Sequence, residues 1–253
     1  MTDAIRFQGL GHTYRGAHWV FRHYDGAIQR GSIFALLGPN GCGKTTLLKI
    51  LLGALAPTEG RVERAGRVAF VPQLFHLSFD FSVLDVVLMG RARHVGLFAQ
   101  PSASDVVAAL DVLGRFGLQD VATRPFTELS GGQRQLAIFA RAMIAAADIL
   151  VLDEPTSALD FKNQQVILDW IGRLAHEDDL TVVLTTHSPS HALAVSDQAL
   201  LMLGESTFQC GAVERVLTEE NLERLYGVPI SRETLTPIFR KRERRRSDAG
   251  SIV

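Results

Sequence analysis

The chain has 253 residues and is 47% hydrophobic, so it can bury a full core in one large domain or two small ones. Its formal charge of -1 argues against a general nucleic-acid binder, and we expect no nucleic-acid partner. Two cysteines, Cys42 and Cys210, are too few for a disulfide framework and favour a reduced, cytosolic setting. We also expect neither a signal peptide nor a membrane-spanning helix, because no run approaches roughly 18 apolar residues.

The first 37 residues are mostly strand-like. The apolar runs Ile5 to Leu10, Trp19 to Tyr24 and Ser32 to Leu37 are separated by glycines and charged turns, which predicts a β-rich segment. Tyr14 lies in the first of these turns. An aromatic ring exposed there could stack on a nucleotide base, although a tyrosine in a β-rich segment is more often ordinary packing.

A glycine-rich stretch then joins the third strand to an apolar, helix-like run. Two glycines five apart are followed by Lys and Thr, which is the pattern of a phosphate-binding loop, although a glycine-rich turn can carry a lysine by chance. Backbone N–H groups of such a loop, and the start of its helix, point at phosphate oxygens. We expect Lys44 to reach the β- and γ-phosphates and Thr45 to bind Mg²⁺. The nucleotide-binding residues expected here are Gly38, Pro39, Asn40, Gly41, Cys42, Gly43, Lys44, Thr45 and Thr46.

A short strand predicted at 67–71 stops at Pro72 and Gln73, from which an amide could reach a metal ion or an attacking water. From residue 74 to about 147, helical periodicities replace the strand-like runs, so we interpret this region as a helical insertion. Its opening is rich in aromatic residues, which suits a groove that grips a helix of another protein. The side chains concerned are Phe75, Leu77, Phe79, Phe81, Leu97 and Phe98.

A second candidate anion site lies at Ser130, Gly131, Gly132 and Gln133. The residues that follow are apolar at the spacing of a helix with one buried face. Ser130 is a good N-cap, and the glycines expose N–H groups at the helix start. Taken alone, the stretch is best explained as a capped helix after a turn.

The buried-looking run Ile149 to Leu152 ends in Asp153 and Glu154, which predicts a central strand delivering two carboxylates to a ligand-binding sheet edge. We expect Asp153 to hold Mg²⁺ through water and Glu154 to orient or deprotonate an attacking water. A further strand, predicted at 181–186, stops at His187. A histidine at a strand end is usually structural, but this one would emerge beside Glu154 and within reach of a γ-phosphate.

Together these residues form a recognisable set in a fixed order, namely GPNGCGKTT, Gln73, LSGGQ, ILVLDEP, SALD and His187. The set resembles the ATP-binding subunit of ABC transporters over about residues 5–227. The resemblance implies an α/β fold: a P-loop NTPase (RecA-like) core with an N-terminal antiparallel β subdomain and an inserted α-helical subdomain. We expect one ABC ATPase domain at 1–238, its core at 1–78 and 148–238, the helical subdomain at about 79–147, and a basic, disordered tail at 239–253.

The resemblance also implies roles for these residues. Tyr14 would stack on adenine, Gln73 would touch Mg²⁺, and Asp153 would support the metal. Glu154 would act as the catalytic base, with Lys44 and His187 on the γ-phosphate. Ser130 to Gln133 would close over the ATP of a second copy of the chain, and Asp160 would communicate across the seam, that is, the interface between the two copies. The working form would therefore be a homodimer that sandwiches two ATP molecules.

The further partners implied are transmembrane permease subunits and, indirectly, a substrate-binding protein, which places the chain peripherally at the cytoplasmic face of the inner membrane. The stretches 81–91 and 219–229 resemble importers of metal chelates and oxyanions, that is ferric siderophores, haem, cobalamin or molybdate. The run from Phe81 through Pro101 resembles a molybdate-type member, which favours molybdate or tungstate within this group.

Other classes with these motifs fit less well. A DNA-repair or chromosome ATPase needs a long coiled coil between Lys44 and Ser130, and a translation-factor ATPase needs two cassettes in one chain. An Fe–S cluster assembly ATPase, which is a single soluble cassette, remains the alternative.

Overall fold

The computed structural model describes residues 2–14, 16, 18–73, 75, 79–92 and 100–230. The expected basic tail at 239–253 lies outside the described residues, as do Leu77, Leu97 and Phe98 of the aromatic-rich stretch.

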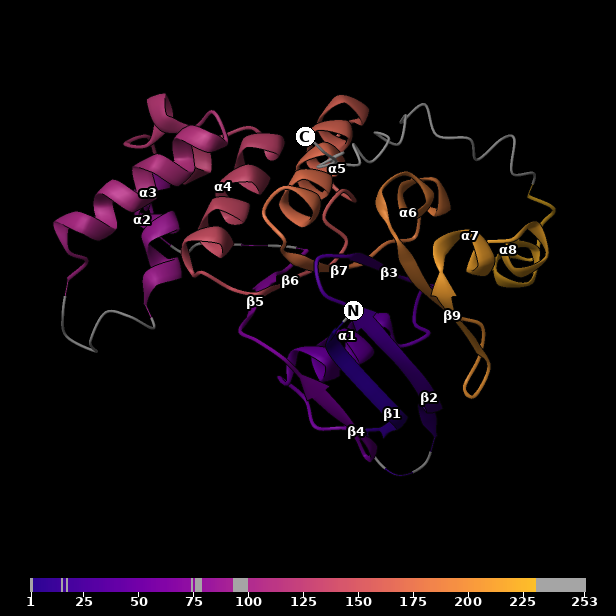
Figure 1. Ribbon diagram of the computed structural model, residues 1–253. Helices are drawn as coiled ribbons and strands as arrows, with labels where there is room; N and C mark the ends of the chain where they lie inside the picture. Colours follow the sequence, from indigo (N-terminus) through magenta and orange to yellow (C-terminus); the bar gives the residue numbers. More distant parts are fainter. Residues whose placement is uncertain are drawn as a thin grey trace, which may run out of the picture.

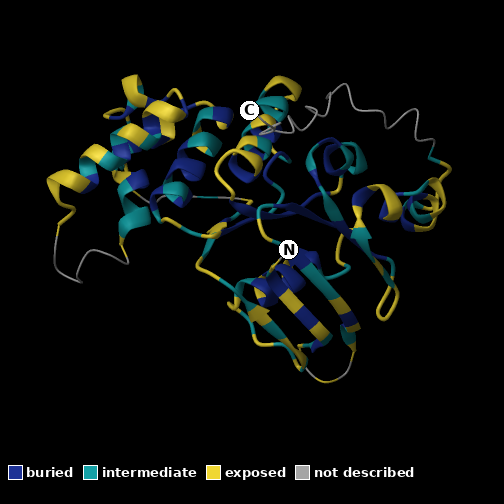
Figure 2. Cartoon of the chain, viewed as in Figure 1, coloured by how far each residue is buried: buried dark blue, intermediate teal, exposed yellow. Residues whose placement is uncertain are grey.

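A six-stranded sheet forms the centre of the molecule, in the order β5-β6-β7-β3-β8-β9 (Figure 1). All neighbouring pairs are parallel except the last, in which β9 runs antiparallel to β8. Strands β3, β6 and β7 are buried along their whole length, as expected of parallel strands covered on both faces (Figure 2). The strands are β3 (Ile33–Leu37), β5 (Val68–Val71), β6 (Ile149–Leu152), β7 (Thr181–Thr185), β8 (Gln198–Met202) and β9 (Phe208–Ala212).

Alternate residues of β3 face two different hydrophobic clusters. Ile33, Ala35 and Leu37 pack with the helices on one face of the sheet. Phe34 and Leu36 pack with helix α1 (Lys44–Leu52) and the antiparallel sheet on the other. The end of β3 is therefore fixed from both sides, which fixes the loop that leaves it.

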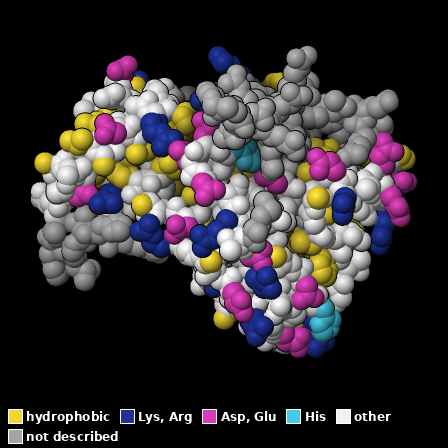
Figure 3. Space-filling model, in the orientation of Figure 1, with side chains coloured by type: hydrophobic (Ala, Val, Ile, Leu, Met, Phe, Trp, Pro, Cys, Tyr) yellow, Lys and Arg dark blue, Asp and Glu magenta, His cyan; other side chains and the backbone are white. Residues whose placement is uncertain are grey.

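The antiparallel sheet has the order β2-β1-β4, with β1 at Asp3–Thr13, β2 at Trp19–Gln29 and β4 at Glu59–Arg64. The first two strands confirm the predicted β-rich beginning and run several residues further than the apolar runs. Strand β4 was not predicted, because its sequence EGRVER is mostly charged and contains few apolar residues. Over this sheet, Lys, Arg, Asp and Glu side chains are interspersed on the face shown in Figure 3.

The region between β5 and β6 is helical, as predicted, and its helices gather on one side of the sheet (Figure 1). Each of the three α-helices begins with a capping box, in which a serine side chain accepts from a backbone N–H and an Asp or Gln reaches back. The serines are Ser82, Ser102 and Ser130. The elements are α2 (Val83–Leu88), η1 (Met89–Arg91), α3 (Ala103–Arg115), η2 (Gln119–Val121), η3 (Phe126–Glu128) and α4 (Gly131–Ile144).

After β6, the described part of the chain contains four helices: α5 (Phe161–His176), α6 (Pro189–Val195), α7 (Val213–Val216) and α8 (Glu219–Tyr226). Buried residues of all four helices belong to the hydrophobic cluster that contains Ile33, Ala35 and Leu37 of β3. Among them are Leu168, Ala192, Val216 and Leu222. Within the described ranges, no helix combines the length and the apolar character needed to cross a membrane.

Two glycines with different surroundings give a test of this packing. A Cβ at Gly90 would clash with the backbone carbonyl oxygen of Arg141, whereas a Cβ at Gly172, inside α5, would meet no atom within 4 Å. We expect Gly90→Ala to lower the free energy of unfolding by roughly 1–3 kcal/mol through overpacking. Gly172→Ala should raise it by about 0.5–1 kcal/mol through helix propensity. Urea denaturation checks both, and a change of the same sign in the two variants would contradict the packing described.

Candidate functional site

The loop between β3 and α1 folds around the ammonium group of Lys44. The Lys44 Nζ donates to the carbonyl oxygens of Gly38 at 2.9 Å and Pro39 at 3.0 Å, and the side chain is buried. Gly41 and Gly43 have φ values of 80° and 103°, in the left-handed region that favours glycine. The sequence therefore places glycines where this tight loop requires them, and a cation lies at its centre.

The side chain of Cys42 belongs to the core side of this loop. Its Sγ lies 3.8 Å from the Sδ of Met202 on β8. Burial raises the pKa of the Cys42 thiol, an effect that the neighbouring Lys44 opposes. The thiol is thus a packing group that anchors the loop to the sheet, and its neutral form leaves Lys44 as the charge of the loop.

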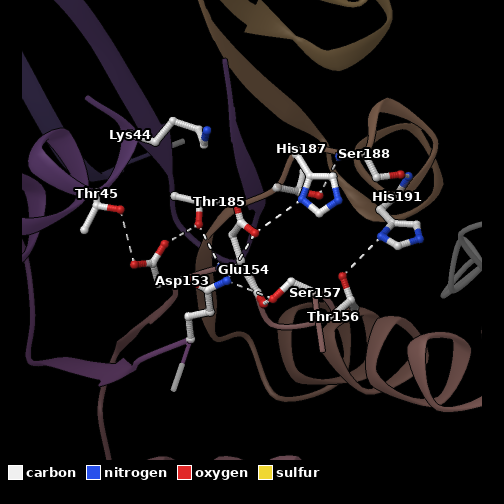
Figure 4. Close-up of polar contacts among 12 residues, drawn as sticks. Lys44, Thr45, Asp153, Glu154, Thr156, Ser157, Thr185, His187, Ser188 and His191 are labelled. Atoms are coloured by element: carbon white, nitrogen blue, oxygen red, sulfur yellow. Dashed lines mark hydrogen bonds and ion pairs between the residues drawn. The ribbon is translucent and has the colours of Figure 1, made fainter. Parts of the chain in front are cut away.

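Two carboxylates meet this loop from the end of β6, as predicted. The Thr45 hydroxyl donates to Asp153 Oδ2 at 3.4 Å, so the start of α1 and the end of β6 are in contact (Figure 4). The other oxygen of Asp153, Oδ1, accepts from the Thr185 hydroxyl at 2.6 Å. Asp153 is thereby held between two hydroxyl groups that come from different elements.

Glu154 follows in an unusual backbone conformation, with φ of 45°. A left-handed φ costs a residue with a side chain on the order of 1–3 kcal/mol, so the surroundings must hold it. The Glu154 N–H donates to Thr185 Oγ1 at 2.8 Å, and its carbonyl oxygen accepts from the Ser157 hydroxyl at 3.1 Å. These two bonds fix the turn that aims the carboxylate away from the strand.

The Glu154 carboxylate faces two of the other predicted residues. Its Oε2 lies 3.3 Å from His187 Nδ1 and 3.5 Å from Gln73 Nε2, which also donates to Ser157 Oγ at 3.1 Å. The structure thus brings together the Gln, Glu and His that the sequence placed at three separate strand ends.

A cavity of about 490 Å³ opens beside these groups. It is lined by the phosphate loop, by the catalytic candidates and by two residues of α8, namely Gly38, Pro39, Asn40, Glu154, His187, Leu225 and Tyr226. The volume lies within the range of small-molecule sites. Glu154 and His187 therefore line the same cavity as the glycine-rich loop.

Tyr14 stands at the other end of the phosphate loop. Its hydroxyl lies 2.8 Å from Thr46 Oγ1, the edge of His12 meets its ring at a centroid distance of 4.8 Å, and 62% of the residue is exposed. The ring is therefore a surface feature beside the loop and not a packed core residue, which is the placement that base stacking requires.

Ser130 is the N-cap of α4, as predicted, and it forms a capping box with Gln133, whose N–H donates to Ser130 Oγ at 3.3 Å. Asp160 caps α5 and binds Asn163, whose side chain leaves no room for a Cβ at Gly132. The residues Ser130, Gly131, Gly132 and Gln133 do not line the cavity of the phosphate loop. The start of α4 is thus separate from the cavity beside the loop that precedes α1.

The oxygen groups present fit a magnesium ion better than a metal held by protein alone. Within the part of the chain that the structure describes, no group of three His, Cys, Asp or Glu residues could hold a metal. Mg²⁺ is commonly bound by one or two carboxylates together with substrate phosphates and water. Thr45 and Asp153 supply a hydroxyl and a carboxylate in contact with each other, and Gln73 brings an amide beside the adjacent Glu154, which suits that mode.

Three residues of the site were missed by the sequence analysis. Thr185 and Ser157 hold the two acids, and Tyr226 closes the cavity from α8. Thr185 had a signal, since it is a polar residue at the end of a buried strand next to the one that carries the acids. Ser157 and Tyr226 had none, because neither a hydroxyl in a turn nor a tyrosine near the end of a helix is unusual.

A sequence profile of the ABC transporter family matches residues 21–157. The molybdate import ATP-binding protein of Haemophilus influenzae is 42% identical over 230 residues, 91% of this chain and 90% of that protein. A protein of Helicobacter pylori named a probable iron chelatin transport ATP-binding protein is 38% identical over 218 residues, 81% of this chain and 86% of its own length. A manganese transport system ATP-binding protein of Synechocystis is 34% identical over 235 residues, 88% of this chain and 90% of that protein.

Solved structures agree with these relatives. A transporter assigned to the metal-chelate type of ABC transporter, in an inward-facing conformation, has a TM-score of 0.86 at 42% identity and covers 90% of both chains. A nucleotide-free ATP-binding cassette from an ABC transporter has a TM-score of 0.74 at 20% identity, with 90% of this chain and 96% of that chain covered, and shows the fold alone. The predicted P-loop NTPase fold is confirmed.

The double role of Thr185 can be tested by removing its hydroxyl while keeping its shape. Thr185→Val leaves Asp153 Oδ1 and the Glu154 N–H without their partner, and should lower the free energy of unfolding by about 1–3 kcal/mol in urea denaturation. Thr185→Ser keeps the hydroxyl and should lose only the about 1 kcal/mol of a buried methyl group. Equal losses in the two variants would show that the hydroxyl holds neither acid.

Proposed function

The chain belongs to the ABC transporter family, and we propose that it is the ATP-binding and ATP-hydrolysing subunit that powers import of a metal chelate or an oxyanion through a membrane permease. The observation that carries the proposal is the meeting of a glycine-rich loop, the carboxylate of Glu154 and His187 at one cavity, with a second carboxylate, Asp153, in contact with Thr45 of the same loop. Proteins of this family bind ATP and are ATPases, so the enzymatic class of the chain follows from the family.

We assign nucleotide binding to the phosphate loop. The backbone N–H groups of Gly38 to Thr46 and the start of α1 would hold the phosphates, and Lys44 would turn its ammonium from the carbonyls of its own loop to the β- and γ-phosphates. Tyr14 would stack on adenine from its exposed place beside Thr46. Thr45, Asp153 and Gln73 would hold Mg²⁺, which neutralises charge on the phosphate oxygens when bound.

We assign hydrolysis to Glu154 and His187. Glu154 Oε2 would accept the proton of the attacking water, since the carboxylate already faces hydrogen-bond donors in the cavity and its backbone is fixed by Thr185 and Ser157. His187 would orient that water and hold the γ-phosphate. The amide of Gln73 contacts both Glu154 and Ser157, so its position would change when the Glu154 carboxylate binds the attacking water.

The working form in this proposal is a dimer of two copies. The capped helix start at Ser130 to Gln133 is exposed at Ser130 and Gly131 and does not line the chain's own cavity, so it would be available to an ATP held by a second copy. Asp160 caps the neighbouring helix and would lie at the seam. Binding of ATP would close the pair, and hydrolysis would open it.

The relatives support the import class and the permease partners. Their names refer to transport of molybdate, iron chelatin and manganese, and the similar structure is a transporter assigned to the metal-chelate type. Within the class we favour molybdate or tungstate, in line with the run from Phe81 through Pro101 and the 42% identity to a molybdate import protein. The subunit would act at the cytoplasmic face of the membrane. The Fe–S assembly alternative is not favoured, because these relatives are transport proteins.

Replacing the proposed base should separate binding from hydrolysis. We expect Glu154→Gln to lower the rate of ATP hydrolysis by roughly 10²–10⁴ because the amide cannot accept the proton. The variant should still bind ATP, and with ATP and Mg²⁺ it should accumulate a dimer in size-exclusion chromatography with light scattering. Glu177→Gln, at the exposed end of α5, is the matched control and should behave as the wild type.

Two results would count against this assignment. An ATP-loaded Glu154→Gln protein that stays monomeric at tens of micromolar would contradict the dimer. Hydrolysis that persists in Glu154→Gln would show that another group activates the water.

The transport role requires the membrane partner. Co-expression with candidate permease subunits should yield a complex that copurifies and accumulates molybdate or tungstate in vesicles in an ATP-dependent way. Parallel measurements with ferric siderophore, haem and cobalamin provide the comparison. Accumulation of one of these would replace molybdate or tungstate as the assigned substrate and keep the import class. Copurification with soluble assembly proteins, and with no permease, would contradict the proposal.

A further inference from the structure

Tyr226 lies at the last position of α8, in a part of the chain that the family profile does not reach. Its hydroxyl donates to the backbone carbonyl oxygen of His187 at 2.9 Å, across 39 positions of sequence. The same residue lines the cavity together with Glu154 and His187. A helix near the end of the described chain thus contacts the segment that carries the proposed γ-phosphate ligand.

The helix that carries Tyr226 is fixed independently of the site. Thr218 caps its start, Gly227 ends it in the left-handed conformation with φ of 71°, and Leu222 and Leu225 are buried in the main cluster. Tyr226 itself packs against that cluster. The hydroxyl is therefore presented from a rigid support.

His187, in contrast, has few restraints of its own. Strand β7 ends at Thr185 and α6 begins at Pro189, so His187 lies in the short connection between them. Its side chain is 60% exposed, and its contact in the site is the carboxylate of Glu154 at 3.3 Å. The direction of the imidazole ring therefore depends on where the backbone of this connection is held.

We propose that Tyr226 is a positioning residue for ATP hydrolysis, which holds the backbone of His187 so that the imidazole faces Glu154 and the cavity. The inference rests on the proposed function of His187 and extends the catalytic unit to the C-terminal helix. Burial raises the pKa of Tyr226 to about 12, so the phenol remains a donor throughout the physiological range. Tyr226 also lines the cavity that Glu154 and His187 share.

The test removes the hydroxyl and keeps the ring. In Tyr226→Phe we expect kcat for ATP hydrolysis to fall roughly three- to tenfold, the cost of one hydrogen bond made to the catalytic segment. KM for ATP should stay within about twofold, because binding belongs to the phosphate loop. The NMR signal of the His187 imidazole, assigned by its loss in His187→Ala, should shift in Tyr226→Phe.

Tyr24 offers a matched control. Its hydroxyl also donates to a backbone carbonyl oxygen, that of Gly204 at 2.7 Å, and its ring is fully buried. Tyr24→Phe should lower the melting temperature at least as much as Tyr226→Phe, and leave both kcat and the His187 signal unchanged.

The outcomes separate this inference from the function on which it rests. Absence of ATP hydrolysis in the wild-type protein, alone and with its permease, would refute the proposed function. Wild-type hydrolysis with an unchanged kcat in Tyr226→Phe would overturn the positioning role. A lower kcat with an unmoved His187 signal, or a raised KM with kcat unchanged, would overturn it too.

Discussion

The site depends on one constraint, which is that β3, β6 and β7 are adjacent, parallel and paired in register. Parallel strands end at the same edge of a sheet, so the residues that follow each strand meet there. Lys44 follows β3, Glu154 follows β6 and His187 follows β7. The 3.3 Å contact between Glu154 and His187 is a consequence of strand pairing and of the burial that holds the pairing in place.

This constraint explains why much of the site could be predicted from the sequence. A buried parallel strand is a short apolar run, and the polar residue after it is easily found, as with Asp153 and His187. The glycine-rich loop before α1 and the N-cap at Ser130 depend on local residue types, so they could also be predicted. Strand β4 was missed because it is held by pairing with β1 and not by its own apolar residues.

The remaining part of the site could not be predicted, because it is made by contacts between distant segments. Tyr226 reaches His187 because α8 packs on the cluster that contains Ile33, Ala35 and Leu37 of β3. No spacing in the sequence indicates that packing. The left-handed turn at Glu154 is similar: its φ of 45° is imposed by Thr185, on another strand, and by Ser157. Strain of this kind is visible only in the folded chain.

The contact between Asn163 and the start of α4 mechanically couples the starts of two helices. Asn163 donates to Asp160, and its side chain lies against Gly132, while Leu159 lies beside Gly131. The beginnings of α4 and α5 are therefore braced against each other, although one comes from the helical region and the other follows the acids. In the proposed dimer, a second copy that displaces the start of either helix would therefore displace the start of the other as well.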